Sequence, residues 1–305
     1  MTTVNEWSGE VLFPAANAKG YRLVFEAETW LRRICHAALL LAEGPAWASR
    51  IRIDLRNRLA AEAKRNAERW YLGVDAEEEL LWSTTHGQLG EILRLPTIQT
   101  TVRALCGMDG EVLASRLLSV SAVRNALAHN RAISDETLAI LEGDLTVVRA
   151  GVNHFKGKTL YAPSDIVSLS ETPSDLSGFV DAFYRLEKEF PRQQLFVSAD
   201  SNFVSLVRLP VEPFDRWPAA RQLRDALSIA SHLVVCVLAN KQGDELQIVV
   251  PRNLPNEDKL EVLQRFMTGA VLQAAWTSRP PEQQHAASAT WPRLWFYENR
   301  RPDQD

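Results

Sequence analysis

Apolar side chains recur every three or four positions through the first half of the chain, which is the pattern of helices with one buried face. Thr85 and Gln88 are spaced to form a capping box at the start of one such helix, and Gly44 ends another. We therefore expect an all-α domain over residues 21–152, preceded by an extended segment at 1–20. The periodicity predicts helices at about 21–43, 47–72, 84–94, 97–106, 109–130 and 134–150.

Beyond about residue 155 the pattern changes. Residues 153–175 are rich in serine, threonine, proline and aspartate, which predicts a linker or loop region. The segment 176–305 has the pattern of a smaller α+β domain with antiparallel hairpins and helices on one face, so we expect an α+β protein overall. Its predicted elements are a helix at 176–190, strands at 195–199, 203–209, 233–239 and 245–250, and helices at about 218–230 and 256–275.

The composition of the 305 residues fits two globular domains, because 46% of them are hydrophobic. No apolar run approaches the ~18 residues of a membrane span, and the N-terminal segment lacks the basic start and apolar centre of a signal peptide. Cys35, Cys106 and Cys236 have no paired spacing. We therefore expect a cytoplasmic protein with free thiols in a reducing compartment, no disulfide framework and no structural zinc site.

The net charge of −4 argues against indiscriminate binding of nucleic acids, which usually needs a broadly basic surface. The segment from Arg50 to Arg69 differs, with seven basic and three acidic residues. One interpretation is a face that follows phosphates. We favour a salt-bridged, solvated surface, because Asp54 with Arg58 and Arg58 with Glu62 are four residues apart.

One predicted helix combines an apolar face with an arginine, an asparagine and a histidine. At ~100° per residue, Asn125 lies about 100° and His129 about 140° from Arg124, and the small Ala128 lies near 40° in the same sector. The apolar residues of the opposite arc are expected to face the core: Val120, Val123 and Leu127.

These three polar side chains suit cleavage of a phosphodiester beside a hydroxyl group. RNA carries a 2′-hydroxyl next to each phosphate, so the nucleophile is already in place. Histidine can transfer a proton near neutral pH, arginine can stabilise charge on a phosphoryl group, and asparagine can orient the phosphate or the imidazole. The scheme needs no metal ion. A plainer interpretation, an ordinary polar helix face making local hydrogen bonds, stays open.

The spacing of arginine and histidine occurs twice in the chain. At Arg149 and His154 we expect an accidental match, because Gly151 interrupts the helix there. The first copy is favoured because an asparagine directly follows its arginine. In addition, Ser134 can cap a following helix that carries two acidic residues in its first turn.

The run Arg124-Asn125-x-x-x-His129, which continues as Asn130-Arg131 and a short turn, resembles the signature of the HEPN domain (higher eukaryotes and prokaryotes nucleotide-binding). The match covers about residues 21–150, roughly half of the chain. Other stretches are similar to HEPN domains in a looser way: the acidic and then Leu-Arg helix at 25–34, the turn and short helix at 80–93, and the lead into the signature at 117–125.

The resemblance implies a metal-independent endoribonuclease, a type common in toxin–antitoxin and anti-phage defence systems. It implies that His129 is the acid–base group, Arg124 the phosphate stabiliser and Asn125 the orienting amide, with no cofactor and no metal. It also implies an RNA substrate, a homodimer that joins two signature helices across a shared cleft, and an antitoxin or activating partner. A two-fold axis would bring a second His129 to the site, which suits a reaction with two proton transfers.

The second half of the chain contains no catalytic constellation of its own. We find no Gly-rich phosphate loop, nucleophile elbow or histidine–carboxylate cluster there, so sensing, regulation or partner binding is the expected role. Two alternatives to the ribonuclease stay open for the whole chain. One is a non-catalytic HEPN module that binds a protein or a nucleotide. The other is a dimeric structural or adaptor protein in which Arg124 and His129 stabilise the interface.

Overall fold

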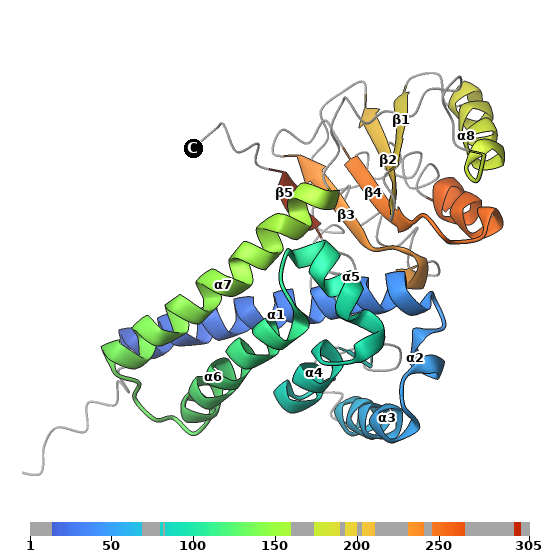
Figure 1. Cartoon of the computed structure of the whole chain (residues 1–305). Coiled ribbons are helices and arrows are strands. Elements are labelled where there is room, and N and C mark those ends of the chain that lie inside the picture. Colours follow the sequence, from blue (N-terminus) through green and yellow to red (C-terminus); the bar gives the residue numbers. More distant parts are fainter. Residues whose placement is uncertain are drawn as a thin grey trace, which may run out of the picture.

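The computed structural model describes residues 14–68, 80–81, 83–159, 174–189, 193–199, 203–210, 231–240, 246–265 and 296–299. Its first half is helical, which confirms the expected all-α N-terminal region (Figure 1). The helices are α1 (Ala15–Glu43), α2 (Trp47–Arg50), α3 (Ile53–Ala67), α4 (His86–Leu93), α5 (Pro96–Cys106), α6 (Gly110–Ala128) and α7 (Asp135–Thr159).

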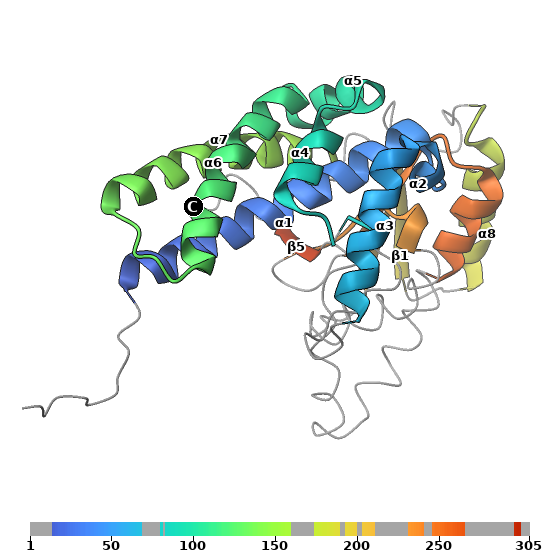
Figure 2. The same cartoon turned by 90° about the horizontal axis from the view of Figure 1, so that it is seen from below.

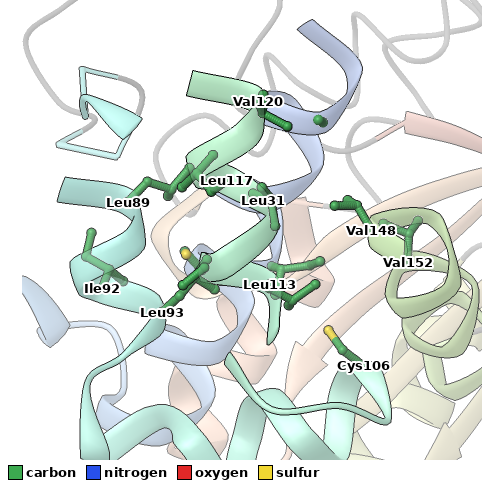
Figure 3. Close-up of a cluster of buried hydrophobic side chains, with 14 of the residues drawn as sticks. Leu31, Leu89, Ile92, Leu93, Cys106, Leu113, Leu117, Val120, Val148 and Val152 are labelled. Carbon is green, nitrogen blue, oxygen red and sulfur yellow. The ribbon is translucent and has the colours of Figure 1, made fainter. Parts of the chain in front are cut away.

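The bundle is built around α1, the longest described helix at 29 residues. Helices α4, α5, α6 and α7 all pack against it. Figure 3 shows the centre of this core, where Leu31 of α1 lies among leucines of α4 and α6 and valines of α7. Burial of these apolar side chains is the main term that stabilises the bundle.

Local sequence signals set several helix ends. Thr85 forms the predicted capping box, because its hydroxyl accepts from the Gln88 N–H at 3.3 Å and the Gln88 side chain accepts from the Thr85 N–H at 2.8 Å. Gly44 and Gly107 end α1 and α5 with φ of 77° and 66°, a region in which glycine is not strained.

Three predicted boundaries were wrong. Helix α1 begins at Ala15, so residues 15–20 are helical rather than extended, and residues 1–13 lie outside the described part of the chain. The predicted helix at 47–72 is two helices, because the backbone is extended at Ile51, whose side chain is buried. Helix α7 runs to Thr159 instead of ending near 150.

The extension of α7 also changes the predicted linker at 153–175. Its first seven residues, 153–159, continue the helix, and 160–173 lie outside the described residues. Gly151 does not interrupt α7. Burial of Val152 and Phe155 in the core offsets the low helix propensity of glycine.

Downstream of α8 (Ser177–Glu189), the described strands form one sheet in the order β1-β2-β4-β3-β5. Strands β1 and β2, β2 and β4, and β3 and β4 pair antiparallel, whereas β5 pairs parallel with β3. The sheet is therefore mixed, not purely antiparallel as predicted. The strands are β1 (Gln193–Ala199), β2 (Phe203–Pro210), β3 (Cys236–Asn240), β4 (Leu246–Pro251) and β5 (Phe296–Asn299).

The sheet also contacts helices on both faces, where the sequence predicted helices on one face. Val249 belongs to the same buried cluster as the helical core. Its neighbours Ile248 and Val250 are buried as well, and side chains alternate along a strand, so they point to the opposite face. Helix α8 and a helix at 256–265 cover that face (Figures 1 and 2).

Within the described residues, no helix is both long and apolar enough to cross a lipid bilayer.

Candidate functional site

The signature residues lie on the surface at the C-terminal end of α6. Arg124, Asn125 and His129 are all exposed. The predicted inward residues of the same helix are buried, as the helical spacing requires. The helix ends at Ala128 rather than at about 130, so His129 is the C-cap residue, with φ −95° and ψ 18°.

The turn after His129 is a Schellman motif, the common hydrogen-bonded end of an α-helix. Asn130 adopts a left-handed φ of 54°, and its N–H donates to the Leu127 carbonyl at 2.9 Å. The N–H of Arg131 donates to the Ala126 carbonyl at 3.0 Å. Asparagine is among the few residues that tolerate this backbone region, so the sequence favours a sharp turn here. The backbone of His129 is thereby held between the helix and a defined turn.

Asn17 of α1 fixes the next part of this turn. Its side-chain Nδ2 donates to the Arg131 carbonyl and its Oδ1 accepts from the Ile133 N–H, both at 3.1 Å. The Asn17 residue is only 3% exposed. A buried amide that satisfies a backbone donor and a backbone acceptor orders the segment between them.

Tyr21 and Gly20 bring α1 against the same turn. The Tyr21 hydroxyl donates to the Leu127 carbonyl at 2.6 Å, which satisfies one of the last carbonyls of α6. A Cβ on Gly20 would lie 2.7 Å from Cδ1 of Ile133, so the missing side chain permits close packing. These contacts, which the sequence analysis did not identify, place the N-terminal end of α1 beside the signature.

The helix that follows begins as predicted. Ser134 is the N-cap residue of α7, and its hydroxyl accepts from the Thr137 N–H at 3.2 Å. Asp135 and Glu136 lie in the first turn of α7. The hydrogen bond from Ser134 lowers the pKa of Glu136. Both ends of the signature turn are therefore anchored by helix caps.

Several arginines near this end have no carboxylate partner among the described residues. Arg22, Arg124 and Arg131 are exposed, and their side chains make no hydrogen bond or ion pair with any residue that the structure describes. Most other arginines are engaged with carboxylates: Arg32, Arg52, Arg58, Arg65, Arg94, Arg103, Arg116, Arg149, Arg252 and Arg265. These arginines are therefore available to attract an anion, because no described carboxylate pairs with them.

The second copy of the spacing has a different environment. Arg149 forms a two-point ion pair with Glu26 of α1, at 2.8 Å from each of its donors. His154 lies against Gly107, whose Cβ position would be 3.0 Å from its ring. These residues pack α7 against α1 and α5, which agrees with the expectation that this match is accidental, although the predicted helix break at Gly151 is absent.

The basic segment at 50–69 is salt-bridged, but only partly as predicted. Arg58 contacts Asp54 at 3.5 Å, whereas its predicted partner Glu62 pairs with Arg65 instead. Arg58 also contacts Glu91 of α4 at 2.8 Å. Arg52 also pairs with Glu91, so two of the seven basic residues join the start of α3 to α4, which weakens the case for a face that follows phosphates.

A half-buried cluster of charged residues was not predicted from the sequence. Arg32 contacts Glu28 at 2.8 Å on the same helix and donates to the carbonyls of Leu81 and Thr84 at 3.2 and 3.0 Å. His86 Nε2 lies 2.9 Å from Glu28 Oε1, in a direction that is off-line for a hydrogen bond. The cluster ties the chain before α4 to α1. The spacing of Glu28 and Arg32, four residues apart, was the available sequence signal.

The cysteines and His232 complete the set of candidate residues. Cys35 and Cys106 are buried free thiols, and burial raises the pKa of both, to about 12 for Cys106. His232 is exposed. The predicted helix at 218–230 and the side chain of Cys236 lie outside the described residues. Across the described part of the chain, no three histidine, cysteine, aspartate or glutamate side chains gather as metal ligands would.

The chain was compared with protein-family models, with curated proteins and with solved structures, and none of the three comparisons gives a match. The resemblance to the HEPN domain is carried by the signature and the looser similarities around it.

Proposed function

We propose that this protein is a metal-independent endoribonuclease of the HEPN type, with Arg124, Asn125 and His129 as its catalytic residues. One observation carries the proposal: these three side chains are exposed at the end of α6, bond to no described residue, and precede a turn that Asn17 and Tyr21 hold in place. A polar face that only stabilises the fold would bond to neighbouring groups. A catalytic group needs the opposite, a rigid backbone with a side chain free to meet a substrate.

The proposed reaction is a transesterification within the RNA chain. The 2′-oxygen of one ribose attacks its own 3′-phosphorus while His129 removes the hydroxyl proton. The bond from phosphorus to the 5′-oxygen of the next nucleotide breaks, and that oxygen takes up a proton. The products are a 2′,3′-cyclic phosphate and a 5′-hydroxyl. Arg124 stabilises the charge on the phosphoryl oxygens, and Asn125 orients the phosphate.

A second copy of the chain is the proposed partner that completes the site. Six of the exposed residues of α6 and its C-cap follow spacings of four and three, which is a 3.5-residue repeat: Glu111, Ser115, Leu118, Ala122, Asn125 and His129. Leu118, at the middle of this stripe, is 64% exposed. Pairing two such stripes about a two-fold axis would bury Leu118 and bring two copies of His129 together, one for each proton transfer.

The experiment that tests the proposal is an RNA cleavage assay in excess EDTA. Wild type is compared with His129→Ala and Arg124→Ala, on total RNA and on tRNA. His232→Ala and Arg185→Ala are the matched controls, because both remove exposed side chains of the same types at the other end of the molecule. We expect wild type and both controls to cleave and to leave 2′,3′-cyclic phosphate ends. Equal cleavage by all five proteins would overturn the assignment of the site.

A non-catalytic protein-binding module is the second candidate, and the exposure of Leu118 is the observation that favours it. In that case His129→Ala and Leu118→Ala would both weaken self-association in light scattering, and wild type would leave RNA intact. The ribonuclease proposal requires instead that His129→Ala abolishes cleavage without changing the oligomeric state.

The remaining parts of the proposal concern the cellular setting. We propose that residues 176–305 form an α+β regulatory or partner-binding domain, and that an antitoxin or another partner acts through it. We also propose a cytoplasmic toxin or anti-phage effector. Co-expression toxicity that depends on His129, and its relief by a neighbouring gene product, would test this setting.

A further inference from the structure

Phe25 of α1 is the most exposed large apolar side chain in the described part of the chain, at 71%. An exposed phenylalanine contributes nothing to the core and leaves a large apolar surface in water. The residues on either side of it in the helix, Val24 and Glu26, pack on the core or pair with α7. Phe25 is therefore available to an external partner.

The position of Phe25 follows from the contacts of α1 with the signature. Asn17 bonds to residues 131 and 133, and one turn later Tyr21 bonds to the carbonyl of Leu127. At this contact the chain direction of α1 is therefore opposite to that of α6. Phe25 is one further turn along the same face as Tyr21, and the same direction along α6 leads toward the turn that carries Arg124.

The charge around Phe25 is favourable for an anionic ligand. Arg22, one turn before Phe25, is exposed and makes no ion pair with a described residue. The nearby carboxylates are already engaged, since Glu26 pairs with Arg149 at 2.8 Å and Glu28 pairs with Arg32 at 2.8 Å. The exposed ring therefore has one arginine without a described ion-pair partner a turn before it, and the two acids that follow it on α1 are paired.

We propose that Phe25 is a substrate-positioning residue that stacks on an unpaired base of the RNA, and that Arg22 binds a phosphate of the same strand. This inference rests on the proposed function and names its substrate class, single-stranded RNA. An aromatic ring stacks on any base, whereas paired bases are hidden in the duplex. The site therefore selects unpaired segments with little regard to base identity.

The test measures binding rather than cleavage, in the His129→Ala background, by fluorescence anisotropy of a labelled 12-nucleotide RNA. The added variants are Phe25→Ala, Phe25→Trp and Arg22→Gln. Ile53→Ala is the matched control, because Ile53 is 65% exposed on a different helix. The same sequence as a duplex is the second probe.

We expect Phe25→Ala to raise the Kd for the single strand about 5- to 100-fold, which is the range for loss of one stacked base. Phe25→Trp retains affinity, Arg22→Gln reduces the salt dependence by about one ion, and Ile53→Ala leaves the Kd unchanged. The duplex binds more weakly than the single strand.

Three outcomes would overturn the inference. They are an unchanged Kd in Phe25→Ala, the absence of saturable RNA binding, and a loss of self-association in Phe25→Ala, which would place Phe25 in a protein interface. Failure of the ribonuclease proposal is seen separately, as intact RNA in the cleavage assay. If RNA binding depends on Phe25 but wild type does not cleave RNA, the RNA-binding site is upheld and the ribonuclease proposal is not.

Discussion

Asn17 and Ile133 are 116 positions apart in the sequence, yet the side-chain amide oxygen of Asn17 accepts a hydrogen bond from the Ile133 N–H at 3.1 Å. The amide nitrogen of the same side chain donates to the Arg131 carbonyl. One buried side chain thus binds the chain on the far side of the His129 turn, and the candidate site depends on a residue near the start of α1.

Asn17→Ala is expected to lower the free energy of unfolding by about 2–3 kcal/mol, because it leaves a buried N–H and a buried carbonyl without partners. Urea denaturation measures the change. Asn57→Ala is the matched control, since Asn57 is exposed on α3 and its replacement should change stability by less than about 0.5 kcal/mol. Equal stability of the two variants would contradict this prediction and show that water replaces the two hydrogen bonds of the Asn17 amide.

Replacing a signature residue, unlike replacing Asn17, should leave the stability of the fold nearly unchanged. Arg124→Ala, Asn125→Ala and His129→Ala are each expected to change the free energy of unfolding by less than about 0.5 kcal/mol, because all three side chains are exposed and unbonded. The cleavage rate should nevertheless fall about 100-fold or more for His129→Ala, as for the loss of a general acid–base group. A large loss of stability in these variants would instead assign them a structural role.

Glu28 should make a pH-dependent contribution to stability. Burial alone would raise its pKa, but the contacts with His86 and Arg32 outweigh burial and hold the pKa at about 2. The folded-state pKa lies below the unfolded value of about 4.3, so the stabilisation is present at neutral pH and is lost as the pH falls toward 2.

Glu28→Gln removes this contribution. We expect the variant to be less stable than wild type at pH 7 by on the order of 3 kcal/mol, with the difference shrinking between about pH 4.5 and 2. Denaturant titrations across that range measure it. Glu43→Gln at the end of α1 is the control, since Glu43 forms no ion pair with a described residue. A difference that is constant with pH would contradict the ionic origin.

Two glycines in helices should respond to alanine with opposite signs. A Cβ on Gly110 would overlap the carbonyl oxygen of Leu93, which is backbone and cannot move aside, so Gly110→Ala should destabilise by about 2 kcal/mol or more. Gly143 lies within α7 with nothing near its Cβ position, so Gly143→Ala should stabilise by about 1 kcal/mol. Thermal unfolding of the two variants measures both changes in stability. Changes of the same sign would contradict the contact between Gly110 and the Leu93 carbonyl.

Helical periodicity predicted most of the N-terminal elements because their buried faces are continuous, as in α6. It also predicted caps that depend on neighbours in the sequence, such as those at Thr85 and Ser134. It failed at Gly151, where burial of Val152 and Phe155 against other helices offsets the low local propensity of glycine. Local signals do not report contacts of that kind.

For the candidate site, the sequence identified the exposed trio on α6 but not the groups that hold it. Asn17 and Tyr21 reach the turn only because α1 folds across it, and no local spacing indicates that pairing. The same holds for β5, whose parallel partner β3 is more than fifty residues earlier in the chain. Such contacts follow from tertiary packing rather than from sequence neighbours.

Helix α1 begins at the signature turn and ends at the sheet, and at 29 residues it is about 43 Å long. Figures 1 and 2 both show the sheet and the α6–α7 turn at opposite ends of the molecule. A ligand bound at the sheet would therefore lie far from the signature residues of its own chain. Helix α1 thus joins the signature turn to the sheet through one uninterrupted helix.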